Sequence, residues 1–254
     1  MLNIVWARIK QRHRTIRYPR RPPVLPDRFR GLPAIDSTKC GTDCGGCAKV
    51  CPVGALAVRD GRMTMDLGKC LFCGECERQC PQGVIRFTRN HQLATRKRES
   101  LILDGGEAKL AAALDGESRK LFGRSLKLRQ VSAGGCNACE ADCNVLSTVV
   151  FDLGRFGVQF VASPRHADGV LITGPVTRNM EEALRKTYDA IPAPKLVIAV
   201  GACAIAGGPY IGHEEQCGGA SAVVPVDVYI PGCPPHPATI LDGLLRALGR
   251  VKEG

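Results

Sequence analysis

Several features that would assign a chain to a common class of protein are missing from this sequence of 254 residues. No apolar stretch approaches the length of about eighteen residues that a membrane-spanning helix needs. The first residues have neither the apolar core nor the small-residue cleavage site of a secretory signal, so we expect the protein to stay in the reducing cytoplasm. No G-x-G-x-x-G or G-x4-G-K-[ST] motif occurs, and we therefore expect no dinucleotide or nucleotide cofactor in this chain.

Acidic residues are scarce at the N-terminal end, where the first thirty residues hold nine Lys or Arg and one Asp. This segment accounts for most of the formal net charge of +11, and no nucleic-acid-binding motif accompanies it, so no nucleic-acid partner is predicted. Between the basic residues, apolar ones recur at helical spacing: Leu2, Val5, Trp6, Ile9 and Ile16. We predict a basic amphipathic helix over residues 1–17 that lies against an anionic membrane or a membrane subunit. The alternatives are a helix docked on another protein and a frayed tail.

Cysteine, by contrast, is abundant, with fourteen in the chain. Eight of them lie in two dense runs, "CGTDCGGCAKVCP" and "CLFCGECERQCP". The second run has the C-x2-C-x2-C-x3-C-P spacing of bacterial two-cluster ferredoxins, in which three cysteines ligate one cubane cluster and the fourth ligates the other. We therefore predict two [4Fe–4S] clusters, the first held by Cys40, Cys44, Cys47 and Cys80 and the second by Cys51, Cys70, Cys73 and Cys76.

Zinc and disulfides are the alternatives for these two runs. Zinc sites usually combine two C-x2-C pairs that are a dozen or more residues apart, and disulfides need an oxidising compartment. Neither fits two compact runs that each close with proline. One departure from the ferredoxin pattern is the extra residue near Thr42 and Asp43, because three residues separate Cys40 from Cys44. That residue is expected either to reshape the first cluster's surroundings or to leave the cluster without Cys40.

The first half of the chain divides by composition into three parts. Residues 1–35 are predicted to combine the basic helix with an extended, proline-rich connector over 18–35. Residues 36–90 are predicted to form an α+β ferredoxin module, with strands in "ALAVRDGRMTMDL" and "GVIRFT" and a turn at Asp60 and Gly61. Residues 91–125 are expected to be a basic linker with one or two short helices.

Residues 126–254 form the last predicted domain, in which short apolar strands alternate with helices. Strands are expected over residues 126–131, 158–163, 169–173, 195–200 and 224–230. Helices are expected from the end of the loop "SAGGCNACE" to about Leu153, and over residues 179–191 and 237–251. This alternation predicts an α/β domain with a doubly wound parallel sheet of the flavodoxin-like type.

Four of the remaining cysteines follow the carboxyl ends of predicted strands in this domain: Cys136, Cys139, Cys203 and Cys233. In a parallel sheet these ends lie at one edge, where such folds build their binding sites. We therefore predict a third [4Fe–4S] cluster at this edge, with a four-cysteine zinc site as the alternative. Cys143 and Cys217 are left over and are expected to be reduced, partly buried thiols, although Cys143 is also placed to line the cluster pocket.

Two groups of motifs resemble a known family. "YP…PDRFRG", leading into the two cysteine runs, resembles the eight-iron ferredoxin subunit of respiratory complex I and of the membrane-bound hydrogenases related to it. "GCNACE", "KLVIAVGACAIAGG" and "VPVDVYIPGCPP" resemble the small subunit of those [NiFe] hydrogenases, including formate hydrogenlyase. Complex I has two adjacent cysteines where this sequence has "GCNAC", the hydrogenase pattern. Ala138 stands where glycine is usual, and Cys143 where no cysteine is expected.

The resemblance implies an electron-transfer subunit with three [4Fe–4S] clusters, serving a [NiFe] large subunit on the cytoplasmic face of the cell membrane. It implies a hydrogenase-type large subunit and membrane subunits as partners, and no catalytic residue in this chain. Glu140, Arg165 and His166 match positions of the family, where Glu140 is expected to face the large subunit; ordinary loop charges are the alternative. Two other functions stay open, namely the same relay in a nickel-free or NADH:quinone-oxidoreductase-like complex, and a free soluble ferredoxin.

Overall fold

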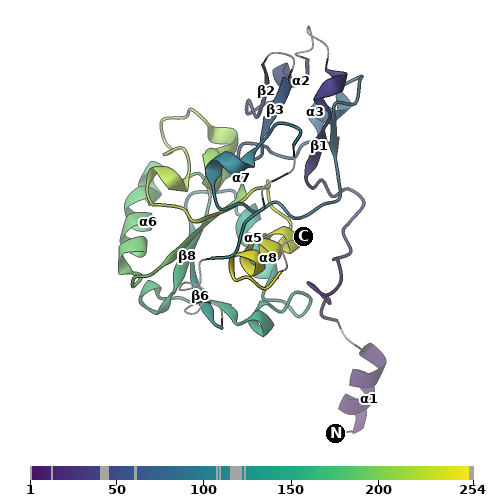
Figure 1. The fold of residues 1–254 in the computed structure, drawn as a ribbon. Coiled ribbons are helices and arrows are strands. Elements are labelled where there is room, and N and C mark those ends of the chain that lie inside the picture. The colour runs from purple at the N-terminus through teal and green to yellow at the C-terminus, as the bar shows by residue number, and fades with distance from the viewer. Residues whose placement is uncertain are drawn as a thin grey trace.

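The computed structural model describes residues 2–12, 14–40, 46–59, 62–106, 108, 110–114, 122 and 124–251. A small module with two short sheets lies at one end of the molecule, and a larger domain around a parallel sheet lies below it (Figure 1). This is the predicted order of an α+β module followed by an α/β domain. Among the described residues, no helix combines the length and the apolar character needed to cross a membrane.

The N-terminal helix α1 (Leu2–Gln11) projects away from the rest of the molecule (Figure 1). Its apolar side chains are exposed, with Leu2 at 85% and Trp6 at 65% of their full accessibility. The helix is shorter than predicted, so Ile16 does not belong to its apolar face. Instead, the amide of Ile16 donates to the carbonyl oxygen of Val150 at 2.9 Å, and its side chain packs against the core of the sheet domain.

The ferredoxin module contains two small antiparallel sheets and two one-turn helices. β1 (Pro33–Ile35) pairs with β4 (Ile85–Phe87), and β3 (Arg62–Asp66) pairs with both β2 (Leu56–Arg59) and β5 (Ile102–Leu103). The helices are α2 (Gly46–Lys49) and α3 (Glu75–Arg78). The strands predicted in "ALAVRDGRMTMDL" and "GVIRFT" are therefore confirmed, and the predicted turn at Asp60 and Gly61 lies outside the described residues.

Two segments that were predicted to lack strands contribute to these sheets. β1 comes from the end of the proline-rich segment, and β5 follows a 3-10 helix, η2 (Arg98–Leu101), inside the predicted linker. The linker also pairs with the second domain, because Thr95 and Tyr229 exchange two backbone hydrogen bonds of 2.9 and 2.8 Å. The segment from Thr95 to Leu103, called the joint from here on, is thus hydrogen-bonded to both domains.

The second domain is built on five parallel strands in the order β10-β9-β8-β6-β7. Their bounds are β6 (Leu126–Ser132), β7 (Val158–Phe160), β8 (Gly169–Thr173), β9 (Leu196–Val200) and β10 (Val228–Ile230). Numbered along the chain, this order is 2-1-3-4-5 read from the β7 edge, which is the flavodoxin-like order. The predicted fold is confirmed, and its switch point lies between β6 and β8.

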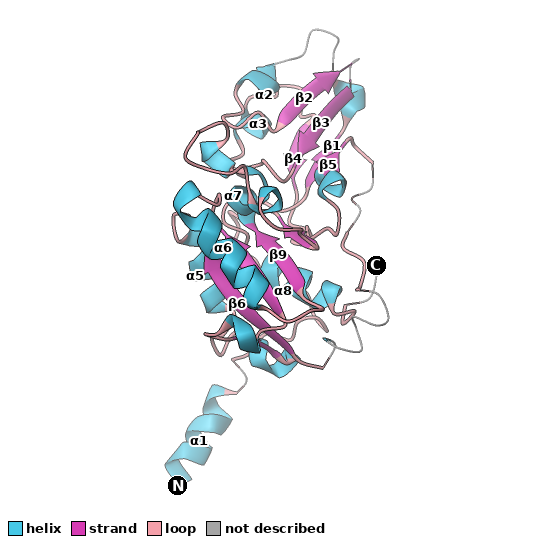
Figure 2. Cartoon of the chain, turned by 90° about the vertical axis from the view of Figure 1, so that its left-hand side faces the viewer, coloured by secondary structure: helices cyan, strands magenta, loops and turns pink. Residues whose placement is uncertain are grey.

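Helices cover both faces of this sheet (Figure 2). Residues alternate between the faces along β8, so Val170 and Ile172 share a core with α6 (Arg178–Ala190) and α7 (Gly201–Ala206). Leu171 points the other way, into a core with α5 (Ala138–Val145) and α8 (Pro237–Ala247). The core on the first face continues without a break into the ferredoxin module, where it includes Met63.

Two elements of this domain are shorter than predicted. α5 was predicted to reach about Leu153 but ends at Val145, and Asp152 adopts a left-handed backbone conformation with φ of 48° that helices exclude. A separate 3-10 helix, η3 (Leu153–Phe156), follows it. β10 is shorter than the predicted strand because Pro225, which has no amide hydrogen to donate, lies in the predicted first part.

Candidate iron-sulfur sites

The predicted ligands of the second cluster lie around one small cavity. Cys51 follows α2, Cys70 and Cys73 lie in the loop after β3, and Cys76 lies in α3; all four line the same cavity. Apolar residues complete its wall, among them Leu56, Met65, Leu71 and Phe87. The structure therefore brings together four candidate ligands, one from the first run and three from the second.

Backbone amides point at two sulfurs of this set. The amide of Phe72 donates to Cys70 Sγ at 3.3 Å, and the amide of Ala55 donates to Cys51 Sγ at 3.2 Å. Burial and the neighbouring thiols raise the pKa of Cys70 to about 12 and that of Cys76 to about 11. These thiols are therefore protonated in the chain alone, and a metal that binds them as thiolates has to displace their protons.

Three of the four predicted ligands of the first cluster belong to the described residues. Cys47 and Cys80 are buried, Cys40 is half-buried, and the amide of Val84 donates to Cys80 Sγ at 3.3 Å. Cys44 and the extra residue before it lie outside the described residues. Cys47 and Cys80 belong to an apolar core and Cys40 packs against it, a setting that suits a cluster site.

The third set gathers at the carboxyl edge of the parallel sheet. Cys136 follows β6, Cys139 lies in the first turn of α5, Cys203 lies in α7 directly after β9, and Cys233 follows β10. The pKa of Cys203 rises to about 11, first because of burial and then because of the nearby Cys233 and Cys136. The pKa of Cys139 is raised by burial and by Cys203, Glu140, Cys143 and Cys233. All four predicted ligands are thus close enough to influence one another.

Glycines reserve space beside these sulfurs. A Cβ atom on Gly201, whose φ is +91°, would lie 2.6 Å from Cys139 Sγ, and one on Gly208, whose φ is +58°, would lie 2.5 Å from Cys203 Sγ. At both glycines the backbone conformation favours glycine, and the missing side chain leaves space beside the neighbouring sulfur. Four thiols around a cradle of this kind fit a bulky iron-sulfur cluster. In the described part of the chain, no three His, Cys, Asp or Glu side chains are grouped closely enough to hold a single metal ion.

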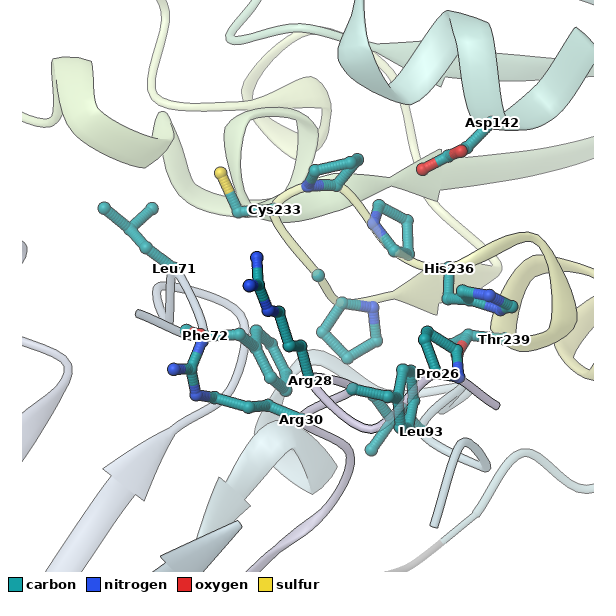
Figure 3. Close-up of a pocket in the computed structure, with 15 residues that line it drawn as sticks. Pro26, Arg28, Arg30, Leu71, Phe72, Leu93, Asp142, Cys233, His236 and Thr239 are labelled. Atoms are coloured by element: carbon teal, nitrogen blue, oxygen red, sulfur yellow. The ribbon is translucent and has the colours of Figure 1, made fainter. Parts of the chain in front are cut away.

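The second and third sets lie next to each other. Cys73 and Cys233 are both exposed, and Cys73 contributes to the raised pKa of Cys233. A pocket of about 300 Å³ opens beside them, between the Leu71–Phe72 segment of the module and the loop from Pro231 to His236 (Figure 3). The ligand loops of the two domains therefore face each other across the joint.

Glu140 is turned inward, contrary to the expectation that it faces a partner. Its side chain is buried, and Oε1 accepts hydrogen bonds from Ser132 Oγ and Thr173 Oγ1, each at 2.6 Å. The carboxylate therefore joins the ends of β6 and β8 beneath the loop of Cys136 and Cys139. Arg165 and His166 lie in the exposed 3-10 helix η4 (Pro164–His166), away from the sheet's carboxyl edge.

The two remaining cysteines lie outside the three sets. Cys143 is fully buried in the core between the sheet, α5 and α8, and burial raises its pKa to about 12. Cys217 is half-buried at the surface near α6, where it lies 3.6 Å from Arg178 Nη1 and 3.5 Å from Glu181 Oε2. Cys217 is thus partly buried, as predicted, whereas Cys143 is buried more completely than predicted.

Sequence reasoning gave no role to two arginines beside the ligand loops. Arg28 and Arg30 come from the "PDRFRG" segment and line the pocket, Arg28 with its guanidinium between Phe72 and Cys233 and Arg30 beside Phe72 (Figure 3). The only signal in the sequence was the presence of this segment in the resemblance, because no spacing relates it to either cysteine run.

Comparison with known proteins follows the two-domain division. Residues 39–84 match the model of the 4Fe-4S dicluster domain, and residues 136–247 match that of the NADH ubiquinone oxidoreductase 20 kDa subunit. The chain is 44% identical over 144 residues to formate hydrogenlyase subunit 7 of Escherichia coli, covering 56% of each protein. It is 42% identical over 134 residues to the probable membrane-bound hydrogenase subunit mbhJ of Pyrococcus furiosus, covering 53% of this chain and 80% of that subunit.

One solved structure is also similar, that of an archaeal membrane-bound sulfane sulfur reductase, a respiratory membrane complex. The superposition covers 54% of this chain and 75% of the other, with 34% identity and a TM-score of 0.47. The chain spans 56% of the length of formate hydrogenlyase subunit 7. The two curated relatives each match about half of this chain.

Proposed function

The chain belongs to the family of the NADH:ubiquinone oxidoreductase 20 kDa subunit and the corresponding hydrogenase subunits, and it also carries a dicluster ferredoxin domain; from this premise, we propose that it relays electrons through three [4Fe–4S] clusters to or from a [NiFe] large subunit. The complex would be a membrane-associated hydrogenase related to complex I. This chain would be its iron-sulfur subunit, and the site at which the substrate reacts would belong to the large subunit.

The observation that carries this proposal is that Leu71 and Phe72, in the loop between Cys70 and Cys73, line the same pocket as Cys233. A [4Fe–4S] cluster takes up and releases one electron at a time, and electron transfer is fast only over short distances. The first and second ligand sets lie in one module, because each set takes one cysteine from the other run. Cys51 belongs to the second set, and Cys80 belongs to the first. The second and third sets meet at the joint. This order gives an electron a path from the ferredoxin module to the carboxyl edge of the parallel sheet.

The chain's own residues have three tasks in such a relay. Twelve cysteines hold the clusters: Cys40, Cys44, Cys47 and Cys80; Cys51, Cys70, Cys73 and Cys76; and Cys136, Cys139, Cys203 and Cys233. The amides of Phe72, Ala55 and Val84 donate to ligand sulfurs and so favour the thiolate and the reduced state. The apolar walls around these sulfurs, including Phe87 and Met65, limit the access of water.

Two surfaces support the proposed partners. Cys136 and Cys233 are exposed at the carboxyl edge, where a large subunit has to bring its own redox centre close. At the other end of the molecule, α1 exposes apolar residues beside Arg8 and Lys10, which suits an anionic membrane surface or a membrane subunit. We therefore place the complex on the cytoplasmic face of the membrane, with the large subunit docked over "GCNACE" and "PGCPP".

The test is anaerobic purification of a tagged chain from solubilised membranes, followed by measurement of iron, sulfide and nickel and by EPR. We expect about twelve irons per chain, a co-purifying large subunit with nickel, and hydrogen-dependent dye reduction. Cys203→Ser should abolish one EPR signal, whereas the matched variant Cys217→Ser should keep every cluster. Zinc in place of about four irons would contradict the third cluster.

Two outcomes would favour the other functions. A complex with its iron but without nickel would favour a nickel-free or NADH:quinone-oxidoreductase-like relative. A monodisperse soluble chain, loaded with iron and bound to no other subunit, would favour a free ferredoxin and would contradict the relay.

A further inference from the structure

Two cationic side chains occupy the space between the second and third ligand sets. Arg28 reaches toward Cys233, and Arg30 lies beside Phe72, in the loop that carries Cys70 and Cys73 (Figure 3). Within the described residues, neither guanidinium has a carboxylate within ion-pair distance. In the described part of the chain, neither positive charge is therefore neutralised by an ion pair, although Asp142 lines the same pocket.

Arg30 is held against the backbone of the ligand loop. Its Nη1 donates to the carbonyl oxygen of Phe72 at 3.3 Å. A Cβ atom added to Gly74 would lie 2.7 Å from Arg30 Nε and 3.0 Å from Cζ, so the guanidinium rests on the bare backbone between Cys73 and Cys76. Gly74 also has a φ of +79°, so its conformation favours glycine, and a side chain there would have to displace the guanidinium.

A fixed cation at this place has a direct electrostatic consequence. Reduction adds an electron to a group that its four thiolates already make negative, and a nearby positive charge stabilises the reduced state more than the oxidised state. The reduction potential of an iron-sulfur cluster depends on net charge and solvent exposure in this way. Both arginines are exposed in the chain alone, so solvent and salt reduce the effect without removing it.

We propose that Arg28 and Arg30 form a cationic bridge that raises the reduction potentials of the second and third clusters and so sets the electron-transfer step between them. Arg30 acts on the second cluster, and Arg28 acts on the third. In this step one electron leaves one cluster and enters the other, with no proton or atom transferred. The inference rests on the proposed function, because it presupposes clusters at both ligand sets.

The experiment is an EPR redox titration of the intact complex carrying Arg28→Gln or Arg30→Gln, with Cys203→Ser used to assign the third signal. At a fixed poise we expect the reduced-to-oxidised ratio to fall about threefold to tenfold, for the second cluster in Arg30→Gln and for the third in Arg28→Gln. A tenfold change corresponds to about 59 mV for one electron. Arg30→Lys, which keeps the charge, should restore most of the potential.

The matched control is Arg185→Gln on α6, which removes the same charge at a surface far from the joint and should leave both potentials unchanged. Unchanged potentials in Arg28→Gln and Arg30→Gln, with both signals present, would overturn the inference while leaving the relay intact. Equal shifts in Arg185→Gln would overturn it as well. Absence of the signals from the unsubstituted complex would instead reject the proposed clusters. If both Arg30 variants lose the second cluster, the inference is tested by the potential of the third cluster in Arg28→Gln. A lower potential supports it, and an unchanged potential overturns it.

Discussion

The two domains of this protein bring their cysteines together by different means. In the ferredoxin module, the candidate ligands come from two short runs, and four of them, Cys47, Cys70, Cys76 and Cys80, belong to the buried core. In the sheet domain, the candidate ligands come from three segments that are far apart in the sequence, and Cys136 and Cys233 are exposed at the edge. There, the core is made of apolar strands, since every residue of β8 and β9 is buried.

This difference predicts a different dependence on the cofactor. The strands of the module have two to five residues each, and its buried sulfurs surround space that the protein's own side chains do not fill. The sheet domain has an apolar core on both faces of its sheet, one shared with the module and one made largely of its own strands and helices. We infer that clusters are part of the module's fold, whereas a cluster at the sheet edge is added to a domain that is already stable.

Removal of the iron tests this contrast most severely. After anaerobic chelation, we expect amide protection to be lost throughout β1 to β4, because buried cysteines are left around an empty core. β8 and β9 should keep most of their protection. Hydrogen exchange followed by mass spectrometry measures both regions in one sample. Equal loss of protection in β8 and β9 would show that the two domains depend on the clusters alike.

The next largest effect on stability is expected at a buried ion pair of helix α8. Asp242 and Arg246 lie one turn apart on α8, 0% and 3% exposed, with Arg246 Nε donating to Asp242 Oδ2 at 2.7 Å. Tyr18 Oη donates to the other oxygen of Asp242 and so ties the N-terminal connector to the sheet domain. Asp242→Asn leaves the guanidinium buried without its counter-charge, and we expect roughly 3–5 kcal/mol of lost stability.

A matched control has the same spacing on an exposed helix face. Glu182 and Lys186 form an ion pair of 2.7 Å on α6 with side chains 77% and 75% exposed. Glu182→Gln should leave the stability almost unchanged, because solvent screens an exposed pair. The opening free energy of the slowest-exchanging amides of β8 and β9 provides the measurement for both variants. Similar losses in the two variants would mean that burial does not distinguish these pairs.

The sequence predicted the features that depend on pattern, and it missed those that depend on tertiary contacts. Apolar strands and their order gave the parallel sheet, and thus the edge shared by Cys136, Cys203 and Cys233. The pairing of β1 with β4 joins three-residue segments about fifty positions apart, and neither segment is long enough to show a periodicity. The inward turn of Glu140 depends on Ser132 and Thr173, which no local pattern relates to it.

The space reserved for the third cluster can be tested with a pair of glycines. Gly201 and Gly218 have φ of +91° and +85°, so alanine at either position should cost a similar backbone strain of about 1–2 kcal/mol. Only at Gly201 does the added Cβ meet a sulfur, 2.6 Å from Cys139 Sγ, whereas nothing lies within 4 Å at Gly218. We expect Gly201→Ala to lose the third EPR signal and Gly218→Ala to keep it. Retention of the signal in both variants would contradict the placement of the cluster beside Cys139.

The smallest effect concerns pH at the boundary between the domains. His91 is buried, its ring edge meets that of Tyr18 with centroids 5.5 Å apart, and burial lowers its pKa. In the unfolded chain a histidine has a pKa of about 6.5. As the pH falls through that value, the unfolded state binds a proton that the folded state does not yet bind, so stability decreases toward acid pH.

His91→Gln should therefore reduce the loss of stability between about pH 7.5 and pH 5.5, measured as the change in opening free energy of the β9 amides. The exposed His213 provides the matched control, since His213→Gln removes a histidine that no part of the domain boundary covers. The same pH dependence in His91→Gln and in the unsubstituted chain would mean that the boundary opens to admit the proton. In that case His91 would not be part of the rigid boundary that keeps the loop of Cys73 beside Cys233.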